Sequence, residues 1–371
     1  MTAEPVGVPP VERALARCVD ALQTCAVPQG NQCGWGTWEL DQRGEPLALS
    51  AGRSALYDGN AGIAWALRTL GRDVGRAAGA TEGAPGLLGG STGVDLAAAR
   101  TCSAPVGGRG FDLGGGLAGD LLALVRTGSR EVAAVVDALV DGARRDGEGA
   151  CWPEEEALCG LAHGVSGVVL ALAEAAAAVP EVAGRALPLV AAGLRWEAAW
   201  FDPVTGGWPD LRGDGPPTSP VMWCHGAAGI AAVRLRLLQL GLALDYPAEA
   251  IAAEAHAGVL ACGRELTRLA ALARAGGLAA VPGGLTLCHG AGGPLDVLVL
   301  AAEVFGDPAH LEAARRIASD LLATAPEDPL DWPGGVRADG CLGLFVGTAG
   351  TALLLARLLD PTIGSLSLLA F

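Results

Sequence analysis

The sequence predicts an all-α protein built from repeated helical hairpins, and three observations support this fold class. Six Gly-x-x-Gly spacings stand at nearly regular intervals along the 371 residues. Each spacing is followed by a run rich in Ala, Leu and Val, whereas the alternation of β-branched residues that marks strands is scarce. More amphipathic stretches separate these apolar runs. Such a regular pairing of segments is typical of helical repeat proteins.

The six Gly-x-x-Gly spacings, called frames below, are regularly placed. They are Gly59/Gly62, Gly116/Gly119, Gly164/Gly167, Gly226/Gly229, Gly290/Gly293 and Gly347/Gly350. The first glycines of successive frames lie 57, 48, 62, 64 and 57 residues apart. An interval near 57 accommodates one helical hairpin. We therefore expect each frame to open an apolar inner helix that is followed by an outer one.

The stretches after and between the frames distinguish the two kinds of helix. Residues 168–178, 230–240 and 351–359 are apolar on nearly all sides, as expected of helices packed inside a protein. Residues 131–144 and 308–322 carry Arg and Asp among their apolar positions. These two amphipathic stretches are therefore expected in the outer layer.

The chain is expected to form a single domain over residues 1–371, because no Ser/Pro-rich or highly charged linker interrupts the frames. Residues 1–50 are expected to form a helix and a loop packed on this domain. The Gly/Pro-rich residues 71–110 are expected to form a long connection within one hairpin. Charged residues interrupt every apolar run before it reaches the roughly 18 residues of a membrane span, so none is expected.

The N-terminus lacks a basic start followed by an apolar block, so we expect a cytoplasmic protein. Its ten cysteines are then more plausible as thiols or metal ligands than as disulfides. The formal charge is −15 and the sequence contains no Lys. This argues against nucleic-acid binding, which needs clustered cations. An acidic surface suits solubility or the attraction of a basic peptide.

A histidine directly precedes the first glycine in three successive frames: Ala162-His163-Gly164, Cys224-His225-Gly226 and Cys288-His289-Gly290. If the inner helices run parallel around a ring, the residues before each frame gather at one end, near the positive helix N-termini. Cys224, Cys288 and His289 then supply two thiolates and one imidazole, a zinc ligand set with an open fourth position. If His225 also binds, the site is closed and structural. Buried cysteines that only fill the core are the third alternative.

His163 lacks a preceding cysteine, so proton transfer suits it better than metal ligation, the alternative being a structural histidine. Asp112 lies one frame earlier and either orients His163 or caps a helix N-terminus. Cys159 is expected to pack in the core, and Asp58 to act as a cap. His256 and His310 lie in amphipathic stretches without frames and are expected to be structural or exposed. The Trp-Pro pairs at Trp152, Trp208 and Trp332 either pack loops or line a peptide groove.

Together these motifs resemble the lanthionine synthetase C-like cyclase family. The phrases that carry the resemblance are Tyr57-Asp58-Gly59-Asn60-Ala61-Gly62, Asp112-Leu113-Gly114-Gly115-Gly116, Ala162-His163-Gly164, Trp223-Cys224-His225-Gly226, Cys288-His289-Gly290 and Gly343-Leu344-Phe345-Val346-Gly347. The resemblance implies an α/α toroid of about seven inner and seven outer helices. It also implies catalytic zinc (Zn²⁺) on Cys224, Cys288 and His289, with His163 and Asp112 matching the family's catalytic His and Asp.

His225 is placed with His163 and Asp112 among the expected catalytic residues. The family often has an Arg a few residues before the Trp-Cys pair, whereas this chain has Ser219-Pro220-Val221-Met222. Substrate positioning therefore follows less directly from the resemblance than metal binding does.

The activity that the resemblance implies is thioether ring formation. Cysteine thiols of a dehydrated precursor peptide add to dehydroalanine or dehydrobutyrine, and His163 protonates the resulting enolate. The chain has no room for a dehydratase, so a separate dehydratase enzyme is an expected partner besides the peptide. The alternatives are a related zinc protein that adds glutathione to dehydroamino acids, and a non-catalytic peptide-binding scaffold of a synthetase complex.

Overall fold

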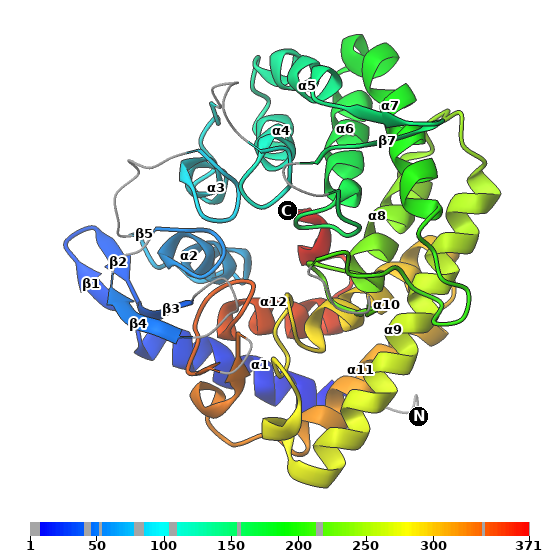
Figure 1. The fold of residues 1–371 in the computed structure, drawn as a ribbon. Coiled ribbons are helices and arrows are strands. Elements are labelled where there is room, and N and C mark those ends of the chain that lie inside the picture. The colour runs from blue at the N-terminus through cyan, green and yellow to red at the C-terminus, as the bar shows by residue number, and fades with distance from the viewer. Residues whose placement is uncertain are drawn as a thin grey trace. The chain divides into compact units, whose positions relative to one another are not determined.

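The computed structural model describes residues 8–40, 46–51, 54–77, 85–103, 110–153, 157–212, 218–335 and 338–370. The described residues contain twelve α-helices and a few short strands (Figure 1), so the predicted all-α class is confirmed. The chain divides into two compact units. The first unit comprises residues 1–81 and 262–371, and the second comprises residues 82–261. The boundary at residue 262 falls within the long helix α9 (Ala248–Gly276).

The second unit is a series of inner and outer helices. It contains α3 (Ser91–Ala97), α4 (Leu117–Arg126), α5 (Val132–Asp141), α6 (Val165–Ala178), α7 (Pro180–Ala198) and α8 (Ala227–Leu240), with the hairpin of β6 (Arg144–Asp146) and β7 (Gly149–Cys151). α6 is buried along almost its whole length and packs against α4, α7 and α8 (Figure 1). α5 and α7 bury only part of their surface. The predicted alternation of apolar inner and amphipathic outer helices is therefore present here.

The first unit has the same plan with more strands. Its helices are α1 (Val8–Thr24), α2 (Asn60–Thr69), α10 (Gly292–Phe305), α11 (Ala309–Leu322) and α12 (Thr348–Leu359). Its strands are β1 (Val27–Gln29), β2 (Gln32–Gly34), β3 (Gly36–Leu40), β4 (Pro46–Ala51), β5 (Arg76–Ala77), β8 (Pro333–Gly334) and β9 (Ala338–Asp339). α12 is buried and packs against α1, α2 and α10. α11 buries one face only.

Residues 27–51 differ from the loop that we expected after the first helix. β1 pairs antiparallel with β2, which also pairs parallel with β5, and β3 pairs antiparallel with β4. Two hairpins separated by a single residue are too short to give a clear alternation of apolar and polar residues. The sequence pattern therefore did not reveal them.

The second glycine of a frame is required by two close contacts at the start of four inner helices. A Cβ atom at Gly167 would lie 2.2 Å from the carbonyl oxygen of Leu161 and 2.9 Å from the Cβ of Leu113, which belongs to the neighbouring repeat. The same pair of contacts recurs at Gly62, Gly119 and Gly229. Any side chain there would push apart the loop and the adjacent repeat.

A seventh frame, Gly90/Gly93, precedes α3 and was missed in the sequence. The Gly93 N–H donates to the Gly86 carbonyl at 3.1 Å, and Gly90 caps the helix in an extended conformation, as do Gly59, Gly116, Gly164 and Gly347. The frame lies inside residues 71–110, which we expected to be a connection. It escaped notice because it begins only 31 residues after Gly59 and α3 has only seven residues.

Backbone hydrogen bonds connect the residues that lie two positions before the first glycine of each frame. In the second unit the series runs Leu88 N to Gly114 O (2.9 Å), Gly114 N to Ala162 O (3.0 Å) and Ala162 N to Cys224 O (3.1 Å). In the first unit it runs Cys288 N to Phe345 O (2.9 Å) and Phe345 N to Tyr57 O (2.9 Å). We call each series a loop relay. Within each unit it fixes the backbone of the loops that carry the candidate functional residues.

Candidate functional site

Asp112 and His163 form a hydrogen-bonded pair in the second unit, called the Asp–His dyad below. The Nδ1 atom of His163 lies 2.6 Å from Oδ2 of Asp112. The other carboxylate oxygen accepts hydrogen bonds from the N–H groups of Gly115 and Gly116, both at 2.8 Å. The sequence had left helix capping and histidine orientation as alternatives for Asp112. One oxygen of the carboxylate bonds the glycine loop and the other bonds the imidazole, and α4 has no side-chain cap hydrogen bond.

The dyad stabilises the protonated form of His163. Burial by itself lowers the pKa of His163, but the hydrogen bond and charge of Asp112 outweigh it and raise the pKa above its usual value. Burial likewise raises the pKa of Asp112, but the contact with His163 and the two glycine N–H groups lower it overall. Because Nδ1 faces the carboxylate, Nε2 is the nitrogen left for proton transfer. The His163 side chain is 47% exposed, so solutes have access to it.

His225 lies beside the dyad but favours the opposite protonation state. Its ring stacks on that of His163 with 5.5 Å between centroids and 24° between planes. Burial, together with the positive charges of Arg212 and His163, lowers the pKa of His225 to about 4 despite the nearby Cys224. Two adjacent imidazoles with pKa values displaced in opposite directions are suited to different roles. The raised pKa of His163 favours its protonated, proton-donating form, whereas the lowered pKa of His225 favours its neutral form.

Arg212 is a residue near this site that the sequence analysis did not identify. Its guanidinium is held by Asp210 through two bonds, Nε to Oδ1 at 2.9 Å and Nη2 to Oδ2 at 2.6 Å. Its charge acts on both His163 and His225. The family pattern places an arginine just before Trp223, and no motif in the sequence marks an arginine as far upstream as Arg212.

Cys224 lies in a tight turn that opens α8. The Met222 N–H donates to the His225 carbonyl at 3.2 Å, and Cys224 accepts from Ala162 in the loop relay. Gly226 has φ 88°, and a Cβ there would lie 1.9 Å from the Pro220 carbonyl oxygen. Cys224 is only 4% exposed. The turn thus fixes Cys224 and His225 in one short loop of the second unit.

Cys288 and His289 occupy the corresponding turn of the first unit, before α10. The Sγ atom of Cys288 lies 3.5 Å from Nε2 of His289. Two such ligands on a tetrahedral zinc ion would lie about 3.6 Å apart, given typical Zn–S and Zn–N distances. The other ring nitrogen, Nδ1, is buried and has no hydrogen-bond partner among the described residues. The donor types and their spacing therefore fit a zinc ion.

A buried charge network supports the loop that leads to the dyad. Arg234 of α8 contacts Glu197 of α7 (Nη2 to Oε2, 2.9 Å) and Glu254 of α9 (Nε to Oε2, 2.7 Å). Glu197 also accepts from Ser166 Oγ at 2.5 Å and from the Gly160 N–H at 2.9 Å. Because Gly160 lies three residues before His163, the network fixes the start of that loop. The sequence showed Arg234 only as a charge within an apolar run.

The remaining candidates have structural surroundings. Cys159 is buried, and desolvation raises the pKa of its thiol well above the usual value. His256 bonds the Ala252 carbonyl on its own helix, and His310 lies on α11 against Phe305. Asp58 is buried at the start of α2.

The three Trp-Pro tryptophans pack loops and do not line a groove. Each indole N–H donates to a backbone carbonyl: Trp152 to Leu139, Trp208 to Glu197 and Trp332 to Pro326. Their side chains are at most 7% exposed. Loop packing, one of the two alternatives for these pairs, is therefore the one observed.

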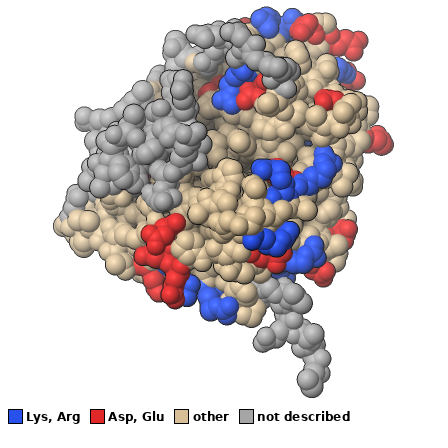
Figure 2. All heavy atoms as spheres, turned by 60° about the horizontal axis from the view of Figure 1, so that its bottom comes forward, with Lys and Arg blue, Asp and Glu red and all other residues tan. Residues whose placement is uncertain are grey.

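The surface and the cysteines have the following arrangement. On the face drawn in Figure 2, arginine side chains and the side chains of Asp and Glu both reach the surface. All ten cysteines are free thiols. Within the described ranges, no helix combines the length and the apolar character needed to cross a membrane.

Comparison with known proteins identifies the family. A search of curated proteins found no match. The family model described as lanthionine synthetase C-like protein matches residues 39–369, nearly the whole chain. The match includes every frame, the Asp–His dyad and both Cys-His-Gly turns. The chain therefore belongs to the lanthionine synthetase C-like family.

Proposed function

We propose that this protein is a zinc-dependent cyclase that forms thioether rings in a dehydrated precursor peptide. The observation that carries the proposal is the Asp–His dyad, because Asp112 contacts the half-exposed imidazole of His163 at 2.6 Å and raises its pKa, which favours the protonated form. Family membership supports a cyclase-type activity. The chemistry of the dyad favours a reaction that ends with proton delivery.

We further propose that Cys224, Cys288 and His289 together hold the zinc ion. Two thiolates and one imidazole are a set that can bind one metal ion and leave a fourth position open. The 3.5 Å spacing of the Cys288 and His289 donor atoms supports this assignment. Zinc, when bound there, would keep a cysteine thiol of the peptide deprotonated near neutral pH. His225 stays neutral and outside the ligand set in this proposal.

The residues of the dyad would complete the reaction. The substrate thiolate adds to the β-carbon of dehydroalanine or dehydrobutyrine, and the electron pair of the double bond moves onto the carbonyl to give an enolate. The proton on Nε2 of His163 is then transferred to the α-carbon. Asp112 holds the Nδ1–H throughout and stabilises the imidazolium before transfer. The thiol proton lost at the start balances the proton delivered at the end.

The proposed reaction requires two partners. The peptide must be dehydrated first, so a separate dehydratase enzyme has to supply the substrate. The ten free cysteines suit a reducing, cytoplasmic setting, which is also where we place the reaction.

Ring formation can be measured directly with a dehydrated cysteine-containing peptide. Free thiols are alkylated after incubation and counted by mass spectrometry. We expect His163→Ala to retain zinc and lose ring formation, and Cys288→Ala to lose both. Matched controls are His256→Ala, which changes an imidazole bonded to its own helix, and Cys262→Ala, which changes a buried thiol of α9. Both controls should cyclise normally.

Four outcomes would contradict the proposal. A folded, zinc-free Cys288→Ala variant with full activity would exclude catalytic zinc. Unaltered cyclisation by His163→Ala would remove the role of the dyad. Wild-type protein that binds the peptide without consuming thiols would favour a scaffold, and consumption of added glutathione in place of peptide thiols would favour the glutathione reaction.

A further inference from the structure

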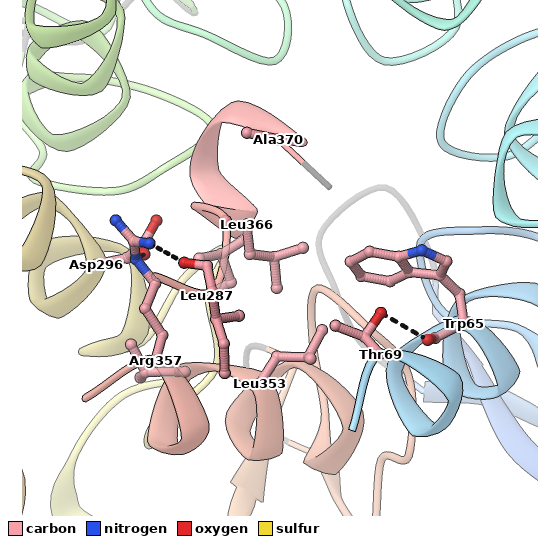
Figure 3. A pocket seen from close by; sticks show the side chains of 11 residues that line it. Trp65, Thr69, Leu287, Asp296, Leu353, Arg357, Leu366 and Ala370 are labelled. Carbon is pink, nitrogen blue, oxygen red and sulfur yellow. Dashed lines mark hydrogen bonds and ion pairs between the residues drawn. The ribbon is translucent and has the colours of Figure 1, made fainter. Parts of the chain in front are cut away.

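A pocket of about 150 Å³ lies within the first unit, and no proposed catalytic residue lines it. Its sides come from α2, α12 and the C-terminal residues 363–370 (Figure 3). Leu353 of α12, Leu366 of the C-terminal segment and Leu287 are buried lining residues, and Trp65 of α2 forms a wall. Thr69 is exposed at the pocket. The pocket is therefore mostly apolar and has an accessible opening.

A buried arginine supplies the polar end of this pocket. Arg357 is 2% exposed, and its Nε lies 2.8 Å from Oδ1 of Asp296. Its Nη1 donates to the Pro361 and Ile363 carbonyls. Its Nη2 has no hydrogen-bond partner among the residues that the structure describes. In Figure 3 the Arg357–Asp296 pair lies on the opposite side of the pocket from Trp65.

The carboxylate of Asp296 makes no hydrogen bond to this nitrogen among the described contacts. Its Oδ2 accepts from Ser365 Oγ at 2.6 Å and from the Ser367 N–H at 3.0 Å, while Oδ1 forms the ion pair with Nε without an aligned hydrogen bond. A buried N–H group without an acceptor is unfavourable, and the large majority of such groups in proteins are paired. The free Nη2 therefore indicates an acceptor supplied from outside the chain.

The size of the pocket limits what can bind. A cavity of about 150 Å³ holds a group the size of benzene, whereas sites for drug-sized ligands span roughly 300–1,000 Å³. A nucleotide or glutathione would not fit inside it. One leucine, isoleucine or phenylalanine side chain would fit inside the pocket, and the apolar lining suits these residues.

The charge of the buried pair limits which kind of group can accept a hydrogen bond from Arg357 Nη2. Asp296 already neutralises Arg357, so a buried carboxylate would add an uncompensated negative charge. A neutral amide carbonyl would not. We propose that the pocket binds one bulky apolar residue of the peptide substrate, with its side chain among the leucines and Trp65 and its main-chain carbonyl accepting from Arg357 Nη2.

This assignment deepens the proposed function, on which it rests for the peptide nature of the substrate. Leu287 directly precedes Cys288, one of the proposed zinc ligands. Occupation of the pocket would therefore select peptides that carry a bulky apolar residue near the reacting cysteine.

Binding can be tested with a small probe, independently of ring formation. N-acetyl-L-leucinamide carries the proposed side chain and amide oxygens, and titration by saturation-transfer NMR measures its affinity. Ligand-size limits place its Kd in the millimolar range. We expect N-acetyl-L-alaninamide, which lacks most of the apolar side chain, to bind at least about tenfold more weakly than the leucinamide. N-acetyl-L-leucine, which carries a carboxylate, should also bind more weakly than the leucinamide.

Variants locate the probe. Thr69→Trp should fill the opening and reduce affinity at least tenfold. The matched control is Thr267→Trp, because Thr267 is exposed on α9 and makes the same hydroxyl bond to a carbonyl four residues earlier. Arg357→Lys keeps the positive charge but removes Nη2, and should weaken leucinamide binding. Its melting temperature, measured by circular dichroism, shows whether the variant is folded.

Several results would overturn the assignment. These are equal affinities for the leucine and alanine probes, tighter binding of the free acid, or leucinamide binding that Thr69→Trp does not change. An ordered water on Nη2 that persists at saturating probe would do the same. Probe binding by a protein that forms no rings would leave the pocket intact and contradict only the cyclase proposal, so the two failures are distinguishable.

Discussion

Asp112→Asn tests whether the charge of the Asp–His dyad, and not its shape, controls His163. Asparagine retains one carbonyl oxygen, which can still accept from the N–H groups of Gly115 and Gly116. The second oxygen becomes an amide group that cannot stabilise an imidazolium. We therefore expect the loop to stay in place while the pKa of His163 falls.

The expected magnitude follows from the geometry of the pair. A hydrogen bond to a charged group contributes roughly 1.5–3 kcal/mol. His163 is 47% exposed, so solvent screening reduces this to about 1 kcal/mol.

The contribution of the Asp–His dyad to stability is lost at both high and low pH. Because the pKa of His163 is raised on folding, its contribution to stability is complete below its usual value and is lost as the pH rises through the raised one. Because the pKa of Asp112 is lowered, its contribution is present above its usual value and is lost as the pH falls through the lowered one. The stability difference between wild type and variant should therefore be greatest between about pH 4 and 6.5 and smaller at pH 9.

NMR titration of the His163 ring protons measures the pKa, and urea unfolding at pH 6 and pH 9 measures stability. Asp202→Asn is a suitable control, because the Asp202 carboxylate also accepts backbone hydrogen bonds but has no histidine partner in the described contacts. An unchanged or higher pKa of His163 in Asp112→Asn would refute the reasoning. A stability difference of equal size at both pH values would refute it as well.

Further predictions concern the fold that supports the site. Gly167→Ala places a Cβ 2.2 Å from the Leu161 carbonyl and should lower the free energy of unfolding by about 3 kcal/mol. Gly184→Ala on α7 meets no atom within 4 Å and should stabilise the protein by up to about 1 kcal/mol in the same urea assay. Arg234→Met leaves buried glutamates unpaired and should cost about 3–5 kcal/mol, whereas Arg268→Met on the surface should change stability by no more than about 0.5 kcal/mol. Equal changes in the free energy of unfolding for the two glycine variants, or for the two arginine variants, would contradict these assignments.

The repeating part of the fold could be predicted because its cause is local. Gly167 and its counterparts are required wherever a loop folds back over the first turn of an inner helix, so each repeat carries the same spacing. Apolar runs then identify the inner helices. The frame at Gly90 was missed because it departs from the usual interval, and its helix is short.

The site residues that could be predicted are likewise those that belong to the repeating pattern. His163, Cys224 and His289 were candidates because they stand at fixed offsets from the frames. Arg212 and Arg234 have no such offset. Their surroundings depend on contacts between helices and loops that are distant in sequence, as in the bonds from Arg234 to Glu197 and Glu254. A single sequence gives no signal for pairings of this kind.

The loop relays separate backbone shape from side-chain chemistry. Their hydrogen bonds use only N–H and C=O groups, so Leu88, Gly114, Ala162 and Cys224 occupy equivalent places in one series despite their different side chains. A substitution such as Ala162→Cys would leave every bond of the series available. The scaffold therefore allows reactive groups to be gained, lost or moved between repeats without refolding, and these positions are the natural targets for redesigning the chemistry of the protein.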